Sequence, residues 1–110
     1  MTETYTLDPA ALEWTDAATA HLPALPEAGP ELLGALLAHV VRKAAGTLAE
    51  SPLMPVSVTQ DTTAAAEPGQ PVTFTAGVDR RTRTLVFANG RAEQAGQVVM
   101  TLTGVFAIAG

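Results

Sequence analysis

Cysteine is absent from this chain of 110 residues, which excludes a disulfide framework, a thiolate metal site and a cysteine nucleophile. Basic residues are also few, since six Lys and Arg stand against eleven Asp and Glu and give a formal net charge of −5. So few cations cannot build the phosphate-neutralising surface that nucleic-acid binding requires. The two histidines, His21 and His39, lack the spacing of metal ligands, so we expect no metal site.

Signals for export and for membrane insertion are also missing from the sequence. The first ten residues, MTETYTLDPA, have neither the basic region nor the apolar region of a secretory signal. Arg42, Lys43 and Gly46 interrupt the best apolar run before it reaches the length of a membrane span, roughly 18 residues. We therefore expect a cytoplasmic protein that does not enter a membrane.

Hydrophobic residues, in contrast, make up 47% of the chain and charged residues 15%, a balance typical of one compact domain spanning residues 1–110. Residues 1–28 carry the weakest pattern. Asp8 followed by Pro9 favours a helix start, because Asp caps free N–H groups and Pro fits the first turn. A helix from Pro9 to Leu22 is one interpretation, followed by a proline-rich connector.

Residues 29–48, GPELLGALLAHVVRKAAGTL, make the longest helical pattern. Pro30 in the first turn and Glu31 near the positive end of the helix dipole favour a helix start there. The opposite side of the helix is made largely of alanines with few charges, so we expect a central helix that is mostly buried. Apolar residues recur on one broad face at 3.6-residue spacing: Leu32, Leu33, Leu36, Leu37, Val40, Val41, Ala44 and Leu48.

Within residues 54–109 the hydrophobic period changes from 3.6 to 2, which indicates strands. Four strands are predicted, in the segments VSVTQDTTAA, VTFTAGV, TLVFANGRAE and VVMTLTGVFAIA. The connections between them are short, so consecutive strands are expected to pair as an antiparallel meander. Gly90 in the third strand is interpreted as a β-bulge. One long helix packed on a curled antiparallel sheet is an α+β fold.

Three stretches together point to a known family. GALLAHVVRKAAG has the small and apolar texture of a buried helix, and MPVSVTQD reads as the strand that follows it. From Pro68 to Gly110, apolar strands alternate with a basic turn and a glycine-containing turn. Over residues 29–110 this succession resembles the hotdog fold, and within it the small acyl-CoA thioesterases of the phenylacetate-degradation type.

The resemblance implies an acyl-CoA ligand, with coenzyme A as part of the substrate and no separate cofactor. It also implies a homodimer, or a homotetramer made of two dimers, with sheets joined edge to edge and acyl-CoA between subunits. In this family, N–H groups at the start of the helix hold the thioester oxygen. A carboxylate on the partner's helix acts as base or nucleophile, and a Ser or Thr on the next strand holds the attacking water.

The sequence departs from this pattern at the residues that carry the chemistry. The family's HGG at the helix start aligns with residues 29–31, so the histidine is missing and a proline stands where an N–H is expected. The mid-helix acid aligns with Ala38, beside His39. Only the strand hydroxyl is kept, as Ser57.

Three residues are therefore candidates for activating the water, each with an alternative role. Glu31 is either a relocated base or a side chain that stabilises the helix start. His39 titrates near neutral pH, and is either a base or a partly buried histidine bonded to backbone; it is turned by about 100° from the expected acid. Ser57 either holds the water or is a small packing residue. Asp61 shares the face of Ser57 and is expected to be solvated.

Arg80, Arg81 and Arg83 cluster near a strand turn of an otherwise acidic protein. The resemblance places basic residues near this turn, where they would contact the phosphates of coenzyme A, and arginine suits bidentate phosphate contacts. The alternative is a solvated hairpin loop.

Two functions from different classes remain open. The first is hydrolysis of a small or medium acyl- or aryl-CoA thioester by water, with the oxyanion held by N–H groups near Leu32 and Leu33. The second is a non-catalytic hotdog module that binds an acyl-CoA or acyl-carrier ligand, or serves as an assembly partner. A hotdog dehydratase fits less well, because no Asp and His lie together near the helix start.

Overall fold

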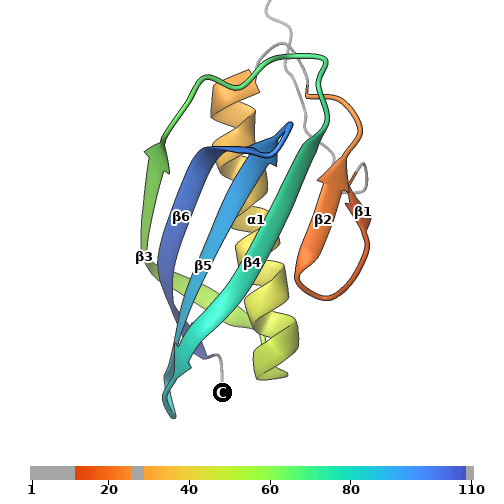
Figure 1. The fold of residues 1–110 in the computed structure, drawn as a ribbon. Helices are drawn as coiled ribbons and strands as arrows, with labels where there is room; N and C mark the ends of the chain where they lie inside the picture. Colours follow the sequence, from red (N-terminus) through yellow and green to blue (C-terminus); the bar gives the residue numbers. More distant parts are fainter. Residues whose placement is uncertain (1–11, 26–28, 109–110) are drawn as a thin grey trace, which may run out of the picture.

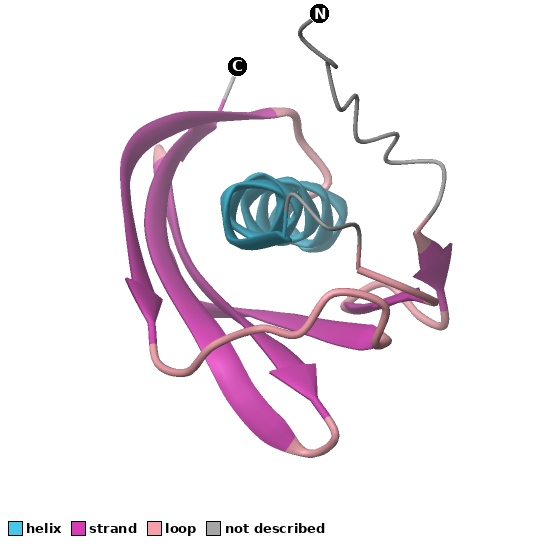
Figure 2. Cartoon of the chain, turned by 90° about the horizontal axis from the view of Figure 1, so that it is seen from above, coloured by secondary structure: helices cyan, strands magenta, loops and turns pink. Residues whose placement is uncertain are grey.

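A computed structural model describes residues 12–25 and 29–108, with side chains of the central helix from residue 32 onward. Its elements are β1 (Glu13–Trp14), β2 (Thr19–Leu22), α1 (Gly29–Ala49), β3 (Leu53–Thr62), β4 (Val72–Arg81), β5 (Leu85–Gln94) and β6 (Gln97–Ile108). The strands form one antiparallel sheet that curls around the helix, as the view along the helix in Figure 2 shows. The predicted α+β arrangement, with a central helix and antiparallel strands, is confirmed.

The strand order in the sheet is β1-β2-β4-β5-β6-β3. Strands β4, β5 and β6 form an antiparallel meander through short turns, as predicted. The predicted pairing of the first of the four strands, β3, with β4 is wrong. Strand β3 pairs with β6 instead, because residues 63–71 make a connection long enough to carry the chain across the sheet. The chain leaves α1 and enters β3, which pairs with β6 from Leu53↔Ile108 to Thr62↔Met100 and lies at one edge of the sheet (Figure 1). No other described strand pairs with the outer edge of β3.

The core lies between α1 and the inner face of the sheet. Phe74 and Phe106 from the sheet are almost fully buried, together with Leu37, Val40 and Val41 from the helix. Leu33, Leu36, Leu37, Val40, Val41 and Ala44 of the predicted stripe are buried, whereas Leu32 at its start is only half-buried. In the last turn Leu48 is 51% exposed, and Ala45 and Ala49 are buried instead. Residues four positions apart are not exactly aligned on a helix of 3.6 residues per turn, so a buried stripe that follows this spacing rotates slowly around the helix. By the last turn the rotation has moved position 48 off the buried face.

Gly90 does not form the predicted bulge, because its pairing with Ala76 and with Leu102 is regular. A Cβ at position 90 would lie 2.3 Å from Cγ2 of Val41 in the helix. The glycine therefore allows close helix–sheet packing, a use that the sequence pattern of a strand does not distinguish from a bulge.

The predicted helix from Pro9 to Leu22 is wrong over its described part. Residues from Thr15 to Thr19 turn the chain between β1 and β2: Thr15 N–H donates to Thr19 O over 3.0 Å, and Ala18 N–H donates to the Asp16 carboxylate over 2.8 Å. Strand β2 then pairs with β4. Pairing with a strand more than 50 residues away in sequence overrides the local helix signal at Asp8 and Pro9, which lies outside the described residues.

The window Leu32–Ala49 has the length and hydropathy of a membrane span, although Arg42 and Lys43 lie within it. Half of this window is buried inside the protein. A central helix covered by a sheet needs the same apolar composition, so its packing accounts for the hydropathy.

Candidate functional site

Strand β3 crosses the side of α1 in the opposite chain direction and is tied to the helix near both of its ends. Arg42 Nε donates a hydrogen bond to the carbonyl oxygen of Leu53 over 2.9 Å. At the other end, Gln60 Nε2 donates to the carbonyl oxygen of Gly34 over 2.6 Å. These two hydrogen bonds fix the edge strand along roughly two turns of helix.

A hollow of about 240 Å³ lies between these two attachments. Its wall is largely apolar, and His39 and Arg42 stand at its rim; the apolar residues are Ala38, Pro55, Val58, Leu102 and Phe106. We call this space the α1–β3 groove. Ala38, which aligns with the family's acid, therefore lies where a ligand would fit. His39 lines the same groove as Ala38. The rotation of about 100° between neighbouring helix positions therefore does not turn the His39 side chain away from the groove.

A second hollow, of about 490 Å³, continues from the groove toward the end of the helix. It shares His39 and Arg42 with the α1–β3 groove and adds Lys43 from the next helix position. We call it the basic hollow, because Arg42 and Lys43 line it and no described Asp or Glu does. Its remaining lining residues are Gly46, Thr47, Ser51, Pro52 and Leu53.

His39 stands where the two hollows meet. Burial lowers the pKa of its imidazole below the usual value of 6.5, and the positive charges of Lys43 and Arg42 lower it further. At neutral pH the imidazole is therefore neutral and can accept a proton. Among the candidate residues, His39 alone combines a described position in the groove with the correct protonation state for a base.

Ser57 is not brought together with His39. The pairing of β3 with β6 shifts between Pro55 and Ser57, and this bulge turns Ser57 to the outer face of the sheet. There it lines a hollow of about 420 Å³ with Thr59, Arg80 and Phe87. Glu31 lies in the first turn of α1, but its side chain is outside the described part of the chain.

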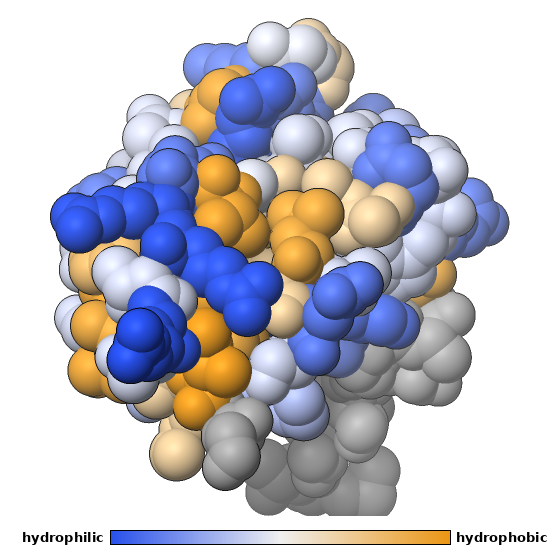
Figure 3. Space-filling view, turned by 90° about the horizontal axis from the view of Figure 1, so that it is seen from below, coloured by the Kyte–Doolittle hydropathy of each residue, from blue (hydrophilic) through white to orange (hydrophobic). Residues whose placement is uncertain are grey.

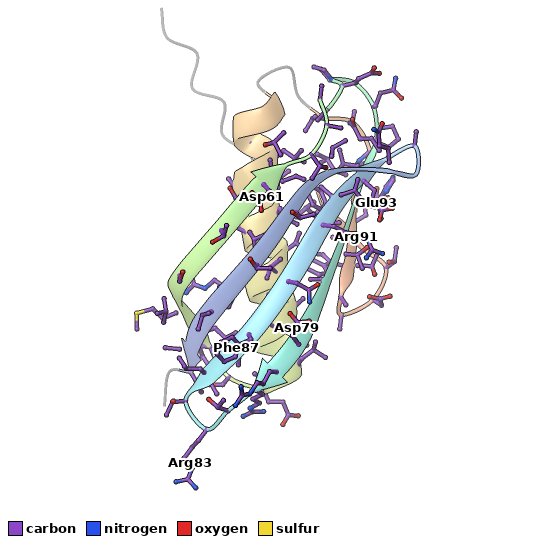
Figure 4. The ribbon with its side chains drawn as sticks, turned by 60° about the vertical axis from the view of Figure 1, so that its left-hand side comes forward. Asp61, Asp79, Arg83, Phe87, Arg91 and Glu93 are labelled. Carbon is purple, nitrogen blue, oxygen red and sulfur yellow. The ribbon has the colours of Figure 1, made fainter. Side chains whose placement is uncertain are left out.

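The three arginines do not gather on one surface with the groove. Arg80 and Arg81 belong to β4, and the guanidinium of Arg80 lies 5.8 Å from the ring centroid of Phe87 on the outer face. Arg83 points away from the molecule at the turn between β4 and β5 (Figure 4). Asp61 is exposed on the outer face, as expected.

Gln60 is a residue of this region that the sequence analysis missed. Side chains alternate along β3, so Gln60 lies on the face opposite Ser57 and Asp61. This alternation is the sequence signal that could have placed Gln60 on the face toward the helix. Its hydrogen bond to Gly34 depends on where β3 crosses the helix, and no local pattern carries that information. Within the described part of the chain, no group of His, Asp and Glu is arranged to hold a metal ion.

The geometry agrees with comparisons against known proteins. The family model of the acyl-CoA thioesterase N-terminal domain matches residues 31–107. A comparison with curated proteins gives no match.

Solved structures with the same fold include the following three proteins. A phenylacetic acid degradation-related protein from Ralstonia eutropha is 18% identical, with a TM-score of 0.74 over 88% of this chain and 83% of that chain. A hypothetical thioesterase from Streptococcus pneumoniae, solved with coenzyme A, is 11% identical, with a TM-score of 0.77 over 90% and 87%. A Streptococcus mutans protein bound to acetyl-CoA is 9% identical, with a TM-score of 0.74 over 84% and 80%.

The central helix inside a curled antiparallel sheet, the family match over most of the chain and these structural relatives lead to one conclusion. This chain has the hotdog fold and belongs to the family of acyl-CoA thioesterase N-terminal domains.

Proposed function

We propose that this protein hydrolyses a small or medium acyl- or aryl-CoA thioester, and that the thioester binds in the α1–β3 groove. The observation that carries the proposal is the position of His39, neutral at pH 7, at the rim of an apolar hollow beside Ala38. Structural relatives solved with coenzyme A and with acetyl-CoA support an acyl-CoA ligand.

In the proposed reaction His39 takes a proton from water while the water oxygen attacks the thioester carbonyl carbon. Backbone N–H groups near Leu32 and Leu33, at the positive end of α1, stabilise the negative charge on the carbonyl oxygen. Because these positions lie about 10 Å along the helix from His39, the N–H groups and the base come from the two different subunits of the homodimer proposed below. The C–S bond then breaks, and the protonated imidazole returns its proton to the leaving sulfur. The products are a free acid and the thiol of coenzyme A.

The other predicted residues have less support for a direct part in this reaction. Ser57 faces the outer side of the sheet, so its hydroxyl does not point toward a water molecule in the α1–β3 groove. Glu31 stays a candidate base, because its helix position is close to the proposed oxyanion site. The contact of Arg80, Arg81 and Arg83 with coenzyme A phosphates also stays a prediction.

The free edge of β3 supports a homodimer. Met54, Val56 and Val58 are 59%, 61% and 42% exposed along this strand. Figure 3 shows hydrophobic surface among hydrophilic side chains on the face of the molecule seen from below. An edge strand with open N–H and C=O groups and apolar side chains is a template for pairing with a second strand. A second copy of β3 would cover this edge and enclose the groove beside it; a homotetramer of two such dimers is the larger alternative.

A direct assay tests the proposal. The purified protein is mixed with a panel of acyl- and aryl-CoA thioesters, and the released thiol is measured with a thiol reagent. Turnover should fall on the order of 10²-fold in His39→Gln, which keeps a polar side chain of similar length but cannot act as a base. Glu31→Gln tests the competing base, and full activity in His39→Gln would overturn the assignment of His39.

A non-catalytic acyl-CoA binding module is the second candidate. One observation favours it: no described Asp or Glu lines the groove, although a carboxylate is the residue that the resemblance leads us to expect there. Binding of acyl-CoA without turnover of any thioester in the panel would select this function and reject hydrolysis.

A further inference from the structure

Two basic side chains of α1 stand beside His39. The chain carries six Lys and Arg and a net charge of −5, yet Arg42 and Lys43 stand next to each other beside His39. None of them serves the negative end of the helix dipole, because no basic residue lies in the last turn of α1. Of the residues the structure describes, only Arg91 and Glu93 form an ion pair.

Both cations are held in place by contacts that leave their charge unpaired by any described carboxylate. Arg42 uses Nε for the hydrogen bond to Leu53 O, which orients its planar guanidinium and leaves two terminal NH₂ groups for another acceptor. Lys43 Nζ lies 5.1 Å from the ring centroid of Trp14. Both side chains are already ordered before a ligand binds. An anion that binds between them therefore costs little further side-chain conformational entropy.

We infer that the basic hollow binds an anionic group, a phosphate or a carboxylate, carried by the ligand of the α1–β3 groove. The hollow, of about 490 Å³, is large enough for such a group, and no described Asp or Glu lines it. A guanidinium with two free terminal nitrogens suits either group, since both offer paired oxygens.

The inference deepens the proposed function and rests on it only for the identity of the ligand. The two hollows share His39 and Arg42, so an anion in the basic hollow and an apolar chain in the groove can belong to one molecule. The anion then comes from one of two sources. It is either a phosphate of coenzyme A or a carboxylate at the far end of the acyl group.

Binding of the anion has a consequence for His39 that is measurable without turnover. Lys43 and Arg42 contribute to the lowered pKa of His39, and an anion that neutralises them removes this contribution. The imidazole should therefore become easier to protonate when the anion is bound. The titration midpoint of His39, followed by NMR of its ring protons, reports the event.

The test uses the full chain with inorganic pyrophosphate and, separately, glutarate, at about 0.1 M ionic strength so that weak surface attraction is screened. The expected result is a rise of the His39 midpoint by roughly half a pH unit or more. Lys43→Gln and Arg42→Lys should each weaken the response. Arg91→Gln, which removes one cation from the outer face, should leave it intact. No rise with either probe, or an equal response in all three variants, would overturn the inference.

Two further probes identify the source of the anion. A rise with coenzyme A but not with pantetheine, which lacks the phosphates, assigns the hollow to phosphate. A rise with the glutaric acid monothioester of pantetheine assigns it to a carboxylate of the acyl group. Neither experiment depends on hydrolysis, so the two proposals can fail separately. Thioesterase activity without anion binding would reject this inference alone, and anion binding without thioesterase activity would reject the proposed hydrolysis alone.

Discussion

Gln60 of β3 and Gly34 of α1 are joined by a hydrogen bond of 2.6 Å from the side-chain amide to the helix carbonyl oxygen. A Cβ at position 34 would lie 2.9 Å from Oε1 of Gln60, so the glycine gives the amide its room. This contact and the Arg42–Leu53 hydrogen bond set the width of the α1–β3 groove.

Loss of the Gln60 amide should loosen the edge strand. Gln60→Ala removes a hydrogen bond in a partly buried position, and we expect the free energy of unfolding to fall by about 0.5–1.5 kcal/mol. Urea denaturation followed by circular dichroism measures the change. Thr59→Ala, one residue away on the outer face, is the matched control and should stay within about 0.5 kcal/mol of the wild type. Equal effects of the two substitutions would show that the Gln60 contact does not hold β3 to the helix.

Gly90 should not tolerate a methyl group. In Gly90→Ala the new Cβ would meet Val41 Cγ2 at 2.3 Å and Leu37 Cδ1 at 3.2 Å, so helix and sheet must move apart. Overpacking of this kind costs about 1–3 kcal/mol, measurable as a lower midpoint of thermal unfolding. Gly77→Ala on the neighbouring strand is the control, because its Cβ would find only the Asn89 side chain, at 3.7 Å. A Gly90→Ala protein as stable as Gly77→Ala would contradict the close packing.

The rate of thioester hydrolysis should depend on the protonation of His39. Because the pKa of His39 is lowered, the neutral base persists below pH 6.5, and kcat/KM should fall only when the pH drops through this lowered pKa. Lys43→Gln removes one cause of the lowering and should move the acid limb to higher pH. A pH–rate profile of both proteins measures the shift. If the two pH–rate profiles superimpose, His39 is not the base whose titration controls the rate.

The same pKa has a consequence for stability. In the unfolded chain His39 titrates near its ordinary pKa of 6.5, so below neutral pH the unfolded state binds more protons than the folded state. Stability should therefore decrease on acidification through the window from 6.5 down to the folded-state pKa. In His39→Gln the dependence on pH in this window should be flatter, which denaturation midpoints at several pH values will show.

Disruption of the β3 edge should give monomers. Val56 is 61% exposed on this strand, and Val56→Lys places a charge where a second copy is proposed to pair. Light scattering coupled to gel filtration should show a dimer for the wild type and a monomer for the variant. Thr103→Lys on the outer face serves as the control, because it adds the same charge away from the edge. A wild-type protein that is monomeric at micromolar concentration would reject the proposed homodimer.

The helix over Gly29–Ala49 and the meander β4–β6 were predictable because both depend on local signals. The helix has its apolar period and its proline near the start, and the strands alternate between short turns. The N-terminal hairpin was not predictable in the same way. Its second strand, Thr19–Leu22, owes its conformation to pairing with β4, so the helix signal around Asp8 and Pro9 pointed to the wrong structure.

The candidate site was predicted in part. The sequence located His39 beside the missing acid at Ala38, and the structure places both in one groove. It also predicted Ser57 as a partner of that site, yet a bulge after Pro55 turns the serine to the other face. A one-residue shift reverses every later side chain of a strand. Pro55 within MPVSVTQD is a local signal for a bulge or an edge strand, and the prediction for Ser57 did not use it.

The sequence by itself determined the helix, the strands of the meander and the absence of a carboxylate at Ala38, because these depend on residue type and on spacing along the chain. The tertiary structure decided which face of β3 meets the helix, and how Gln60 and Arg42 attach the strand to it. It also decided that His39 shares a basic hollow with Arg42 and Lys43. These relationships join residues of separate elements, and their geometry comes from packing the whole sheet around one helix.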